Sequence, residues 1–197
     1  MTGCDLLSNS NLCAVFLTLI LFFSGCVAPN AELNSSSDDD EKEQSSLLEA
    51  QLVPEWTAES HTGDEFNRST MAQGAYIAYF SAPWCTHCEA TLDAYDQVIP
   101  EGRMMIFSKE DNPDFTDMNQ WHNTTENNLN RTISRPFMLH PDFASAMTVT
   151  SIPHVAFVNE QGYVYQNEIG KRTNQTMLSD IWNATLIATY NTSTGWS

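Results

Sequence analysis

The order of hydrophobic and polar positions predicts a strand followed by a helix in the middle of the chain. The run from Ala75 to Ser81 is rich in aromatic and β-favouring residues and has no polar face, which is typical of a buried central strand. Pro83 and Trp84 end this run. Apolar residues then recur at helical spacing, which predicts a helix ending near Pro100, with its buried stripe formed by Cys88, Leu92, Tyr95 and Ile99.

The rest of the pattern predicts an α/β fold with a central mixed sheet and helices on both faces. Residues 103–108 read as a second buried strand, parallel to the first with a right-handed crossover. Residues 112–139 are polar and interrupted, and predict one or two helices and a loop. Residues 155–165 predict a strand–turn–strand hairpin. A last amphipathic helix is predicted from Thr176 to about Tyr190, with an inward face of Met177, Leu178, Ile181, Trp182, Leu186 and Ile187.

The charge balance limits the partners of the protein. The chain has 8 Lys and Arg against 25 Asp and Glu, a formal net charge of −17. Phosphate backbones and anionic membrane surfaces repel such a surface, so nucleic-acid binding is excluded. The length of 197 residues is enough for one ordinary domain with tails.

The N-terminal residues predict export and anchoring to a membrane. The uncharged apolar run from Leu12 to Phe23 is too short to span a bilayer and suits the core of a signal peptide. It leads into Ser24-Gly25-Cys26, which resembles a lipobox with Cys26 as the lipid anchor. No Lys or Arg precedes the run, and Phe23 stands where lipoboxes usually have Leu, so an uncleaved signal anchor is the alternative. Either arrangement predicts an extracytoplasmic protein held at the outer face of the cytoplasmic membrane.

Three segments are therefore predicted: a signal peptide over residues 1–25, a flexible acidic linker over 26–54 and one domain over 55–197. The linker includes the polar run from Asn34 to Glu41, which has too little apolar surface to fold. The excess of Asn-x-Ser/Thr sequons predicts an exported glycoprotein. The sequons begin at Asn34, Asn67, Asn123, Asn130, Asn174, Asn183 and Asn191.

The cysteine count points to a redox pair, a metal pair or a single structural disulfide. Cys4, Cys13 and Cys26 lie in or beside the N-terminal signal, so Cys85 and Cys88 are the one close pair that remains. This pair stands where the buried strand gives way to the helix. A thiolate at a helix N-terminus is stabilised by the helix dipole, which predicts Cys85 as the nucleophile and Cys88 as the shielded resolving cysteine.

Three stretches together resemble the thioredoxin superfamily, and within it the TlpA/ResA-like group of exported, membrane-anchored thiol–disulfide oxidoreductases. They are Trp56–Phe66, Ala75–Cys88 with its Trp-Cys-Thr-His-Cys motif, and Ser151–Gly170 with its Ser-Ile-Pro-His start. The resemblance implies a thioredoxin fold with an insertion before a cis-proline, no cofactor, exported protein thiols and disulfides as substrates, and a membrane redox partner. It also implies a cis Ile152–Pro153 bond beside the cysteine pair, with the backbone of Ile152 pairing with an extended substrate segment.

Other residues around the pair bear on the reactivity of Cys85 and on the reduction potential of the pair. Trp84, beside an exposed Cys85, is interpreted as a wall facing the substrate, and His87 as an imidazole that stabilises the Cys85 thiolate. Tyr79 stands where thioredoxin has a buried Asp, and Thr91 and Asp93 stand where TlpA-like proteins have Glu and Pro. The family points to a reductant, whereas His87 and the missing acid predict a potential above the roughly −270 mV of thioredoxin, towards about −180 mV.

A metal site is the alternative from another functional class. Sco-like copper chaperones share the fold, and Cys85 and Cys88 could bind copper or zinc together with His87, His140 or His154. Those chaperones typically use a Cys-x-x-x-Cys spacing, which is one residue longer than the spacing here. His154 is otherwise expected at the rim or surface, and His61, His122 and His140 are expected at the surface.

Overall fold

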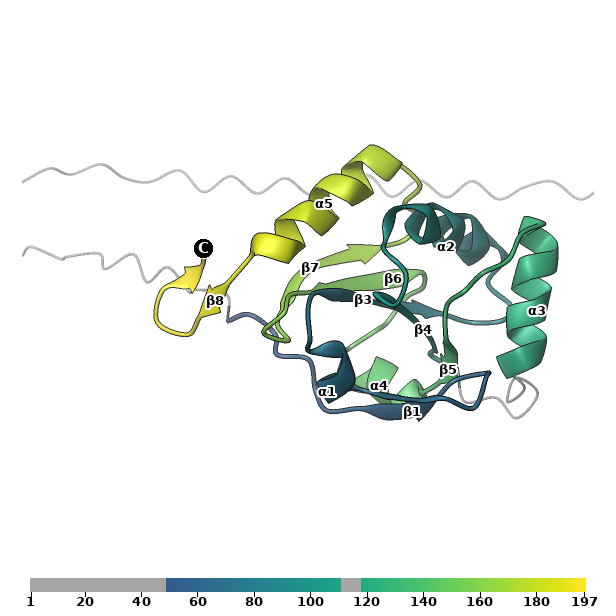
Figure 1. Cartoon of the computed structure of the whole chain (residues 1–197), viewed down its shortest axis with the longest axis horizontal. Coiled ribbons are helices and arrows are strands. Elements are labelled where there is room, and N and C mark those ends of the chain that lie inside the picture. Colours follow the sequence, from purple (N-terminus) through teal and green to yellow (C-terminus); the bar gives the residue numbers. More distant parts are fainter. Residues whose placement is uncertain (1–48, 111–117) are drawn as a thin grey trace, which may run out of the picture. The chain divides into compact units, whose positions relative to one another are not determined.

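The computed structural model describes residues 49–110 and 118–197, which form a central sheet between two layers of other elements (Figure 1). In spatial order the sheet contains β5 (Phe137–Leu139), β4 (Met104–Ser108), β3 (Tyr76–Ser81), β6 (His154–Val158) and β7 (Val164–Ile169). The β3–β4 and β4–β5 pairs are parallel, whereas β3–β6 and β6–β7 are antiparallel. The predicted mixed sheet, the parallel first pair and the β6–β7 hairpin are therefore confirmed.

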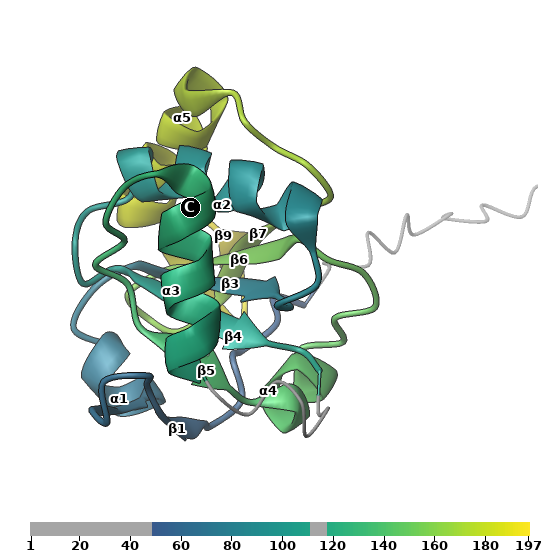
Figure 2. The ribbon, with the colours of Figure 1, turned by 90° about the vertical axis from the view of Figure 1, so that its right-hand side faces the viewer.

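One face of the sheet is covered by the three long helices, α2 (Thr86–Val98), α3 (Met118–Leu129) and α5 (Gln175–Ile187) (Figures 1 and 2). Ile77 and Tyr79 of β3 point into this core and meet Leu92 and Tyr95 of α2 and Trp182 of α5. These side chains are almost fully shielded from solvent.

The opposite face is covered by smaller elements near the start and middle of the domain. They are the antiparallel pair β1 (Thr57–Glu59) and β2 (Glu65–Asn67), followed by α1 (Arg68–Met71) and α4 (Pro141–Ala146). Trp56 is central to this second core, with its ring centroid 5.1 Å from that of Phe107 and 5.5 Å from that of Phe143. Alternate residues of β3 thus enter two different cores, which explains why β3 has no polar face.

The ordered domain begins earlier than the predicted linker boundary near Pro54. Leu52 forms a β-bridge with Tyr163, the Val53 amide donates to the Gly162 carbonyl, and the Val53 side chain is fully buried. Residues 51–53 therefore belong to the domain, and the linker prediction is wrong for them. The predicted signal segment, Cys26 and the linker up to residue 48 lie outside the described residues. Within 49–110 and 118–197, no helix is both long and apolar enough to span a bilayer.

The C-terminal end differs from the prediction. Helix α5 stops at Ile187, and Leu186 and Ile187 are exposed, so the prediction that both face inward is wrong. Thr185 is fully buried in their place, and its hydroxyl donates to the Ile181 carbonyl at 2.7 Å. The chain then forms a short hairpin of β8 (Tyr190–Asn191) and β9 (Gly195–Trp196), which the sequence pattern did not predict.

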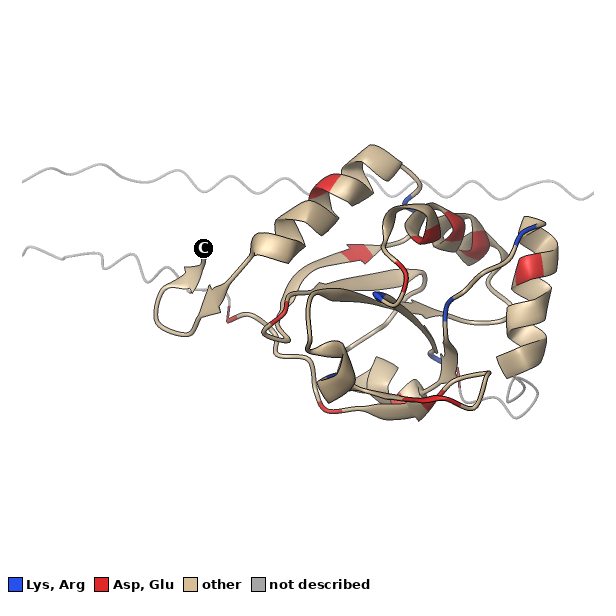
Figure 3. Cartoon of the chain, viewed as in Figure 1, with Lys and Arg blue, Asp and Glu red and all other residues tan. Residues whose placement is uncertain are grey.

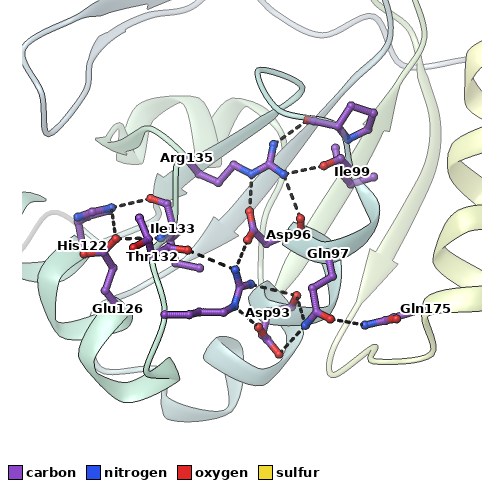
Figure 4. A network of polar contacts seen from close by, with 12 residues as sticks. Asp93, Asp96, Gln97, Ile99, His122, Glu126, Thr132, Ile133, Arg135 and Gln175 are labelled. Carbon is purple, nitrogen blue, oxygen red and sulfur yellow. Dashed lines mark hydrogen bonds and ion pairs between the residues drawn. The ribbon is translucent and has the colours of Figure 1, made fainter.

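Two arginines from the segment before β5 hold the C-terminal part of α2, which is rich in acidic residues (Figures 3 and 4). The Arg135 guanidinium is 5% exposed and donates to the Asp96 carboxylate and to the carbonyls of Asp96, Ile99 and Pro100. Arg131 joins the carboxylates of Asp93 and Asp96 at 2.7 and 2.6 Å. Arg135 thus donates to carbonyls at and just after the end of α2, where helix carbonyls lose their partners within the helix.

Candidate functional site

The cysteine pair lies where β3 turns into α2. After β3 ends at Ser81, the Cys85 amide donates to the Ala82 carbonyl at 3.0 Å, which closes a tight turn. Cys85 is the N-cap residue of α2 and is joined to Cys88 by a disulfide, with 5.3 Å between their Cα atoms. The Cys85 sulfur therefore lies at the positive end of the helix dipole, which stabilises a thiolate there.

Both cysteines are shielded from solvent in this disulfide form. Cys85 is 2% exposed and Cys88 is 1% exposed, so the expectation of an exposed Cys85 is wrong for the oxidised protein. The neighbouring Trp84 is 52% exposed, so a large apolar ring stands at the surface directly before the disulfide. The turn tucks the Cys85 side chain against the start of α2 and leaves the Trp84 ring outside.

His87 places an imidazole beside the disulfide. Its Nε2 atom lies 3.6 Å from Cys85 Sγ, while the residue itself remains exposed. A protonated imidazole at this distance favours the Cys85 thiolate, which is the role predicted for His87.

The peptide bond between Ile152 and Pro153 is cis, as the resemblance implied. Pro153 immediately precedes β6, and the β3–β6 register pairs Phe80 with His154. Pro153 therefore lies beside the C-terminal end of β3. It is at the same end of the sheet as the turn that carries Cys85. The Pro153 carbonyl accepts from the Gly170 amide at 2.8 Å, which ties this segment to the end of β7.

His154 is a buried structural residue, so its expected position at the rim or surface is wrong. It is 5% exposed, its Nε2 lies 3.0 Å from Asn167 Oδ1, and its ring packs edge-on against Phe80. Its place inside β6, opposite β3, explains this burial.

Two groups beneath Cys88 complete the site. The hydroxyl of buried Tyr79 donates to the Cys88 carbonyl at 2.8 Å, and burial raises the pKa of Tyr79 well above its usual value. Thr91, one helical turn after Cys88, is fully buried, and its hydroxyl has no hydrogen-bond partner among the described residues. The sequence marked both positions as departures from related proteins, but it did not indicate that a hydroxyl would be left without a partner.

One group of side chains in the described part of the chain could hold a metal ion. Cys85, His87 and Cys88 each offer a ligand atom, and these atoms all lie within 4.8 Å of one another. Two thiolates and an imidazole suit copper(I) or zinc, and the sulfurs are available as thiolates only after the disulfide is reduced. His140 and His154, considered above as further ligands, are not in this group.

His61 and His122 form a second cluster of titratable groups and are half-buried, so the prediction of simple surface positions is wrong. Their rings stack with centroids 4.1 Å apart. His61 Nδ1 accepts the backbone N–H of Phe137 at 3.2 Å, so this nitrogen carries no proton. Burial, followed by the proximity of His122, lowers the pKa of His61, with Glu126 and Asp64 acting in the opposite direction. A proton on His61 Nδ1 would face the N–H of Phe137.

We therefore expect the unfolded chain to bind a proton at His61 more readily than the folded domain does. The free energy of unfolding should then fall as the pH decreases below the ordinary His value of 6.5. His61→Asn supplies an acceptor that does not titrate, and urea unfolding of this variant should lose less stability between pH 7.5 and 5.5 than that of the wild type. Equal losses in the two proteins would contradict this role of His61, since His140 and the carboxylates titrate in both.

The sheet order β5-β4-β3-β6-β7, the disulfide at the start of the helix after β3 and the cis-proline at the start of β6 together define the thioredoxin fold. Comparison with solved structures gives the same fold. A thiol:disulfide interchange protein from Chlorobium tepidum is 19% identical, with a TM-score of 0.57 over 70% of this chain and 97% of that one.

Two other solved structures are similar at the same level. The exposed lipoprotein thioredoxin of Streptococcus pneumoniae is 17% identical, with a TM-score of 0.54, and the match covers 66% of this chain and 98% of that one. A thiol-disulfide isomerase from Corynebacterium glutamicum is 13% identical, with a TM-score of 0.56 over 71% of this chain and 98% of that one. No protein-family model and no curated protein matches the sequence.

Proposed function

We propose that this chain is a thiol–disulfide oxidoreductase that exchanges the Cys85–Cys88 disulfide or dithiol with protein substrates. The observation that carries the proposal is the disulfide at the N-terminus of α2, with His87 Nε2 3.6 Å from Cys85 Sγ. A structural disulfide needs neither a helix dipole nor an imidazole beside one sulfur, whereas a reactive thiolate benefits from both. The similar solved structures described as interchange proteins and isomerases support the same reaction.

The reaction needs no cofactor. In the reducing direction, the Cys85 thiolate attacks one sulfur of a substrate disulfide, the substrate S–S bond breaks, and the other substrate sulfur leaves as a thiolate that takes up a proton. Cys88 then loses its proton and attacks Cys85, which re-forms the Cys85–Cys88 disulfide and releases the second substrate thiol. Two electrons pass to the substrate, and the reverse sequence oxidises a substrate dithiol.

The surroundings of the pair supply a binding surface for an extended substrate segment. Trp84 offers an exposed apolar ring, and the cis Ile152–Pro153 segment lies at the same end of the sheet as the turn that carries Cys85. In this role the backbone of Ile152 pairs with the substrate main chain, and side-chain contacts with Trp84 position the substrate sulfur near Cys85. Because both cysteines are buried, the side chains over the disulfide must move slightly apart as substrate binds.

The proposed location is extracytoplasmic, with the domain tethered at Cys26 or by an uncleaved signal anchor. The apolar run before Cys26 and the sequons support this location, as does the similarity to a protein described as an exposed lipoprotein. Exported proteins are then the substrates, and a membrane redox protein exchanges electrons with the pair. Several sequon asparagines also cap helices or turns: the side-chain oxygens of Asn67, Asn174 and Asn191 accept backbone N–H groups.

The direct test of the activity is catalysed reduction of insulin disulfides in a glutathione buffer. The wild-type protein should accelerate the reaction, and Cys85→Ser should reduce it to the uncatalysed rate because the attacking sulfur is removed. A wild-type protein that does not exceed the uncatalysed rate in either the reducing or the oxidising direction would contradict the proposed function.

His87 bears on whether the pair acts as an oxidant or as a reductant. Replacing His87 with Ala should raise the pKa of the Cys85 thiol and lower the reduction potential by roughly 30 mV, which is a tenfold change in the equilibrium with glutathione. The reason is that the imidazole stabilises the Cys85 thiolate and hence the reduced form. Thr86→Ala is the matched control, because it alters an exposed neighbour at the same helix start without removing an imidazole. An unchanged potential in His87→Ala would show that the imidazole does not tune the pair.

A metal-binding role is the second candidate, because the Cys85, His87 and Cys88 ligand atoms lie within 4.8 Å of one another. In this role the protein is a Sco-like copper-binding chaperone, and the reduced pair holds copper(I). A stoichiometric metal in the purified, reduced protein, together with no exchange with insulin or glutathione, would favour this candidate over the oxidoreductase.

A further inference from the structure

Thr91 is an exception among the buried helical threonines in the part of the chain that the structure describes. A threonine inside a helix commonly returns its hydroxyl to the carbonyl four residues earlier. Thr125 does so with the Trp121 carbonyl at 3.0 Å, and Thr185 does so with the Ile181 carbonyl at 2.7 Å. The hydroxyl of Thr91 is fully buried but makes no such bond, nor any other among the described residues. A buried hydroxyl without a partner costs free energy in the disulfide form.

The position of Thr91 relates this cost to the cysteine pair. Thr91 and Cys88 are three residues apart on α2, and both are buried, so their side chains are neighbours on the same face of the helix. In the disulfide the Cys88 sulfur is bonded to Cys85 and is only a weak acceptor. After reduction, or in a mixed disulfide at Cys85, Cys88 becomes a thiol or thiolate, and a thiolate is a strong acceptor.

The charged and titratable groups around this position have other partners, except Tyr95, whose buried hydroxyl also has no hydrogen-bond partner among the described residues. The Tyr79 hydroxyl is bonded to the Cys88 carbonyl, and burial raises the pKa of both Tyr79 and Tyr95. Glu89, in the first turn of α2, accepts from Asn128 of α3 at 2.7 Å. Glu168 of β7, whose negative charge adds to the raised pKa of Tyr95, is paired with Arg172. His87 lies on the Cys85 side of the pair, 3.6 Å from its sulfur.

We infer that the Thr91 hydroxyl donates a hydrogen bond to the Cys88 sulfur once the disulfide opens, and that this bond prepares Cys88 to resolve the mixed disulfide. This inference rests on the proposed exchange reaction and assigns to a neutral hydroxyl a part in the resolving step. The attacking Cys88 thiolate is stabilised by the bond, while its proton passes to solvent or to the departing substrate thiolate. The hydroxyl has no partner in the oxidised form and gains one in the states in which Cys88 must react.

The test compares Thr91→Val, which keeps the shape but removes the hydroxyl, with Thr91→Ser, which keeps the hydroxyl. Cys88 is titrated by alkylation in a Cys85→Ala background, and resolution of a mixed disulfide with glutathione is followed at several pH values. Thr91→Val should raise the pKa of Cys88 by about one unit and slow resolution roughly threefold near pH 7, because the roughly tenfold lower thiolate fraction is partly offset by the greater nucleophilicity of a more basic thiolate. Thr91→Ser should stay within about twofold of the wild type in both measurements.

Two further results separate this inference from a structural role and from the proposed function. Thr91→Val should make the disulfide form more resistant to urea, since an unpartnered hydroxyl is replaced by a methyl group. Thr91→Val could instead resolve the mixed disulfide more slowly while being less stable and leaving the pKa of Cys88 unchanged. That result would indicate only a packing defect and overturn the inference. If Thr91→Val does not fold, a Thr91→Ala variant with wild-type Cys88 pKa would overturn it equally. Failure of wild-type protein to exchange with glutathione would instead refute the proposed function.

Discussion

Replacing Cys88 with Ser is expected to leave substrate proteins covalently attached to Cys85. The variant keeps the sulfur at the N-cap of α2, beside His87, and loses the sulfur that would displace the bound substrate. Incubation with a membrane and envelope extract should therefore yield adducts that migrate above the free protein without reductant and collapse to it with reductant. Catalytic turnover of insulin should fall to the uncatalysed rate.

The matched control is Cys85→Ser, which retains only Cys88, the cysteine inside the helix. Because Cys88 lies inside α2, whereas Cys85 holds the N-cap position with His87 Nε2 3.6 Å from its sulfur, this variant should form few or no adducts. Equal trapping by both variants would contradict the assignment of Cys85 as the attacking cysteine. Complete absence of adducts in Cys88→Ser would contradict exchange with protein substrates.

The second large effect concerns stability, because Arg135 holds the helix that carries the disulfide. Arg135→Met should lower the free energy of unfolding by about 3–5 kcal/mol, the usual cost of removing one partner from a buried ion pair. The substitution keeps an apolar stem of similar length and leaves the carbonyls of Asp96, Ile99 and Pro100 without this donor (Figure 4). Urea unfolding followed by circular dichroism measures the change through the midpoint and slope.

Arg131→Met is the matched control for this prediction. Arg131 pairs with Asp93 and Asp96, but its side chain is 31% exposed, so the loss should be about 1 kcal/mol or less. A loss for Arg135→Met as small as that for Arg131→Met would mean that the buried contacts at the end of α2 contribute little.

The strand–helix–strand centre of the fold could be predicted because burial on both faces leaves a strong signal. In β3, Ile77 and Tyr79 enter one core while Tyr76 and Phe80 enter the other, so the run is apolar throughout. The hydrophobic stripe of α2 and the β6–β7 hairpin are equally clear in the pattern. The short strands β1, β2 and β5 gave no such signal, because three residues cannot establish a period.

The ends of the domain depended on contacts that a local pattern does not contain. Val53 is buried because residues 51–53 lie against the β6–β7 turn, far away in sequence. At the other end, apolar Leu186 and Ile187 form the last residues of α5 but are exposed, because the buried face of the helix runs through Leu178, Trp182 and Thr185. In both places tertiary contacts overrode the local preference.

The centre of the candidate site was accessible from sequence, whereas its supporting residues were only partly so. The Cys-x-x-Cys motif at a helix start predicted the redox pair, and the resemblance to the thioredoxin superfamily implied the cis Ile152–Pro153 bond. The burial of His154 follows from its pairing with β3, and the stacking of His61 on His122 joins segments far apart in the chain. The free hydroxyl of Thr91 depends on a side-chain rotamer, which no sequence pattern specifies.

The most direct test of the account is the redox equilibrium of the wild-type Cys85–Cys88 pair with glutathione, read by mass after alkylation of free thiols. We predict one reversible two-electron transition with a midpoint above about −270 mV and towards about −180 mV. A midpoint near or below −270 mV would reverse the expected direction and make the protein a reductant, with exchange retained. A pair that remains a disulfide in buffers down to about −300 mV would be a structural disulfide, and that result would contradict the central claim.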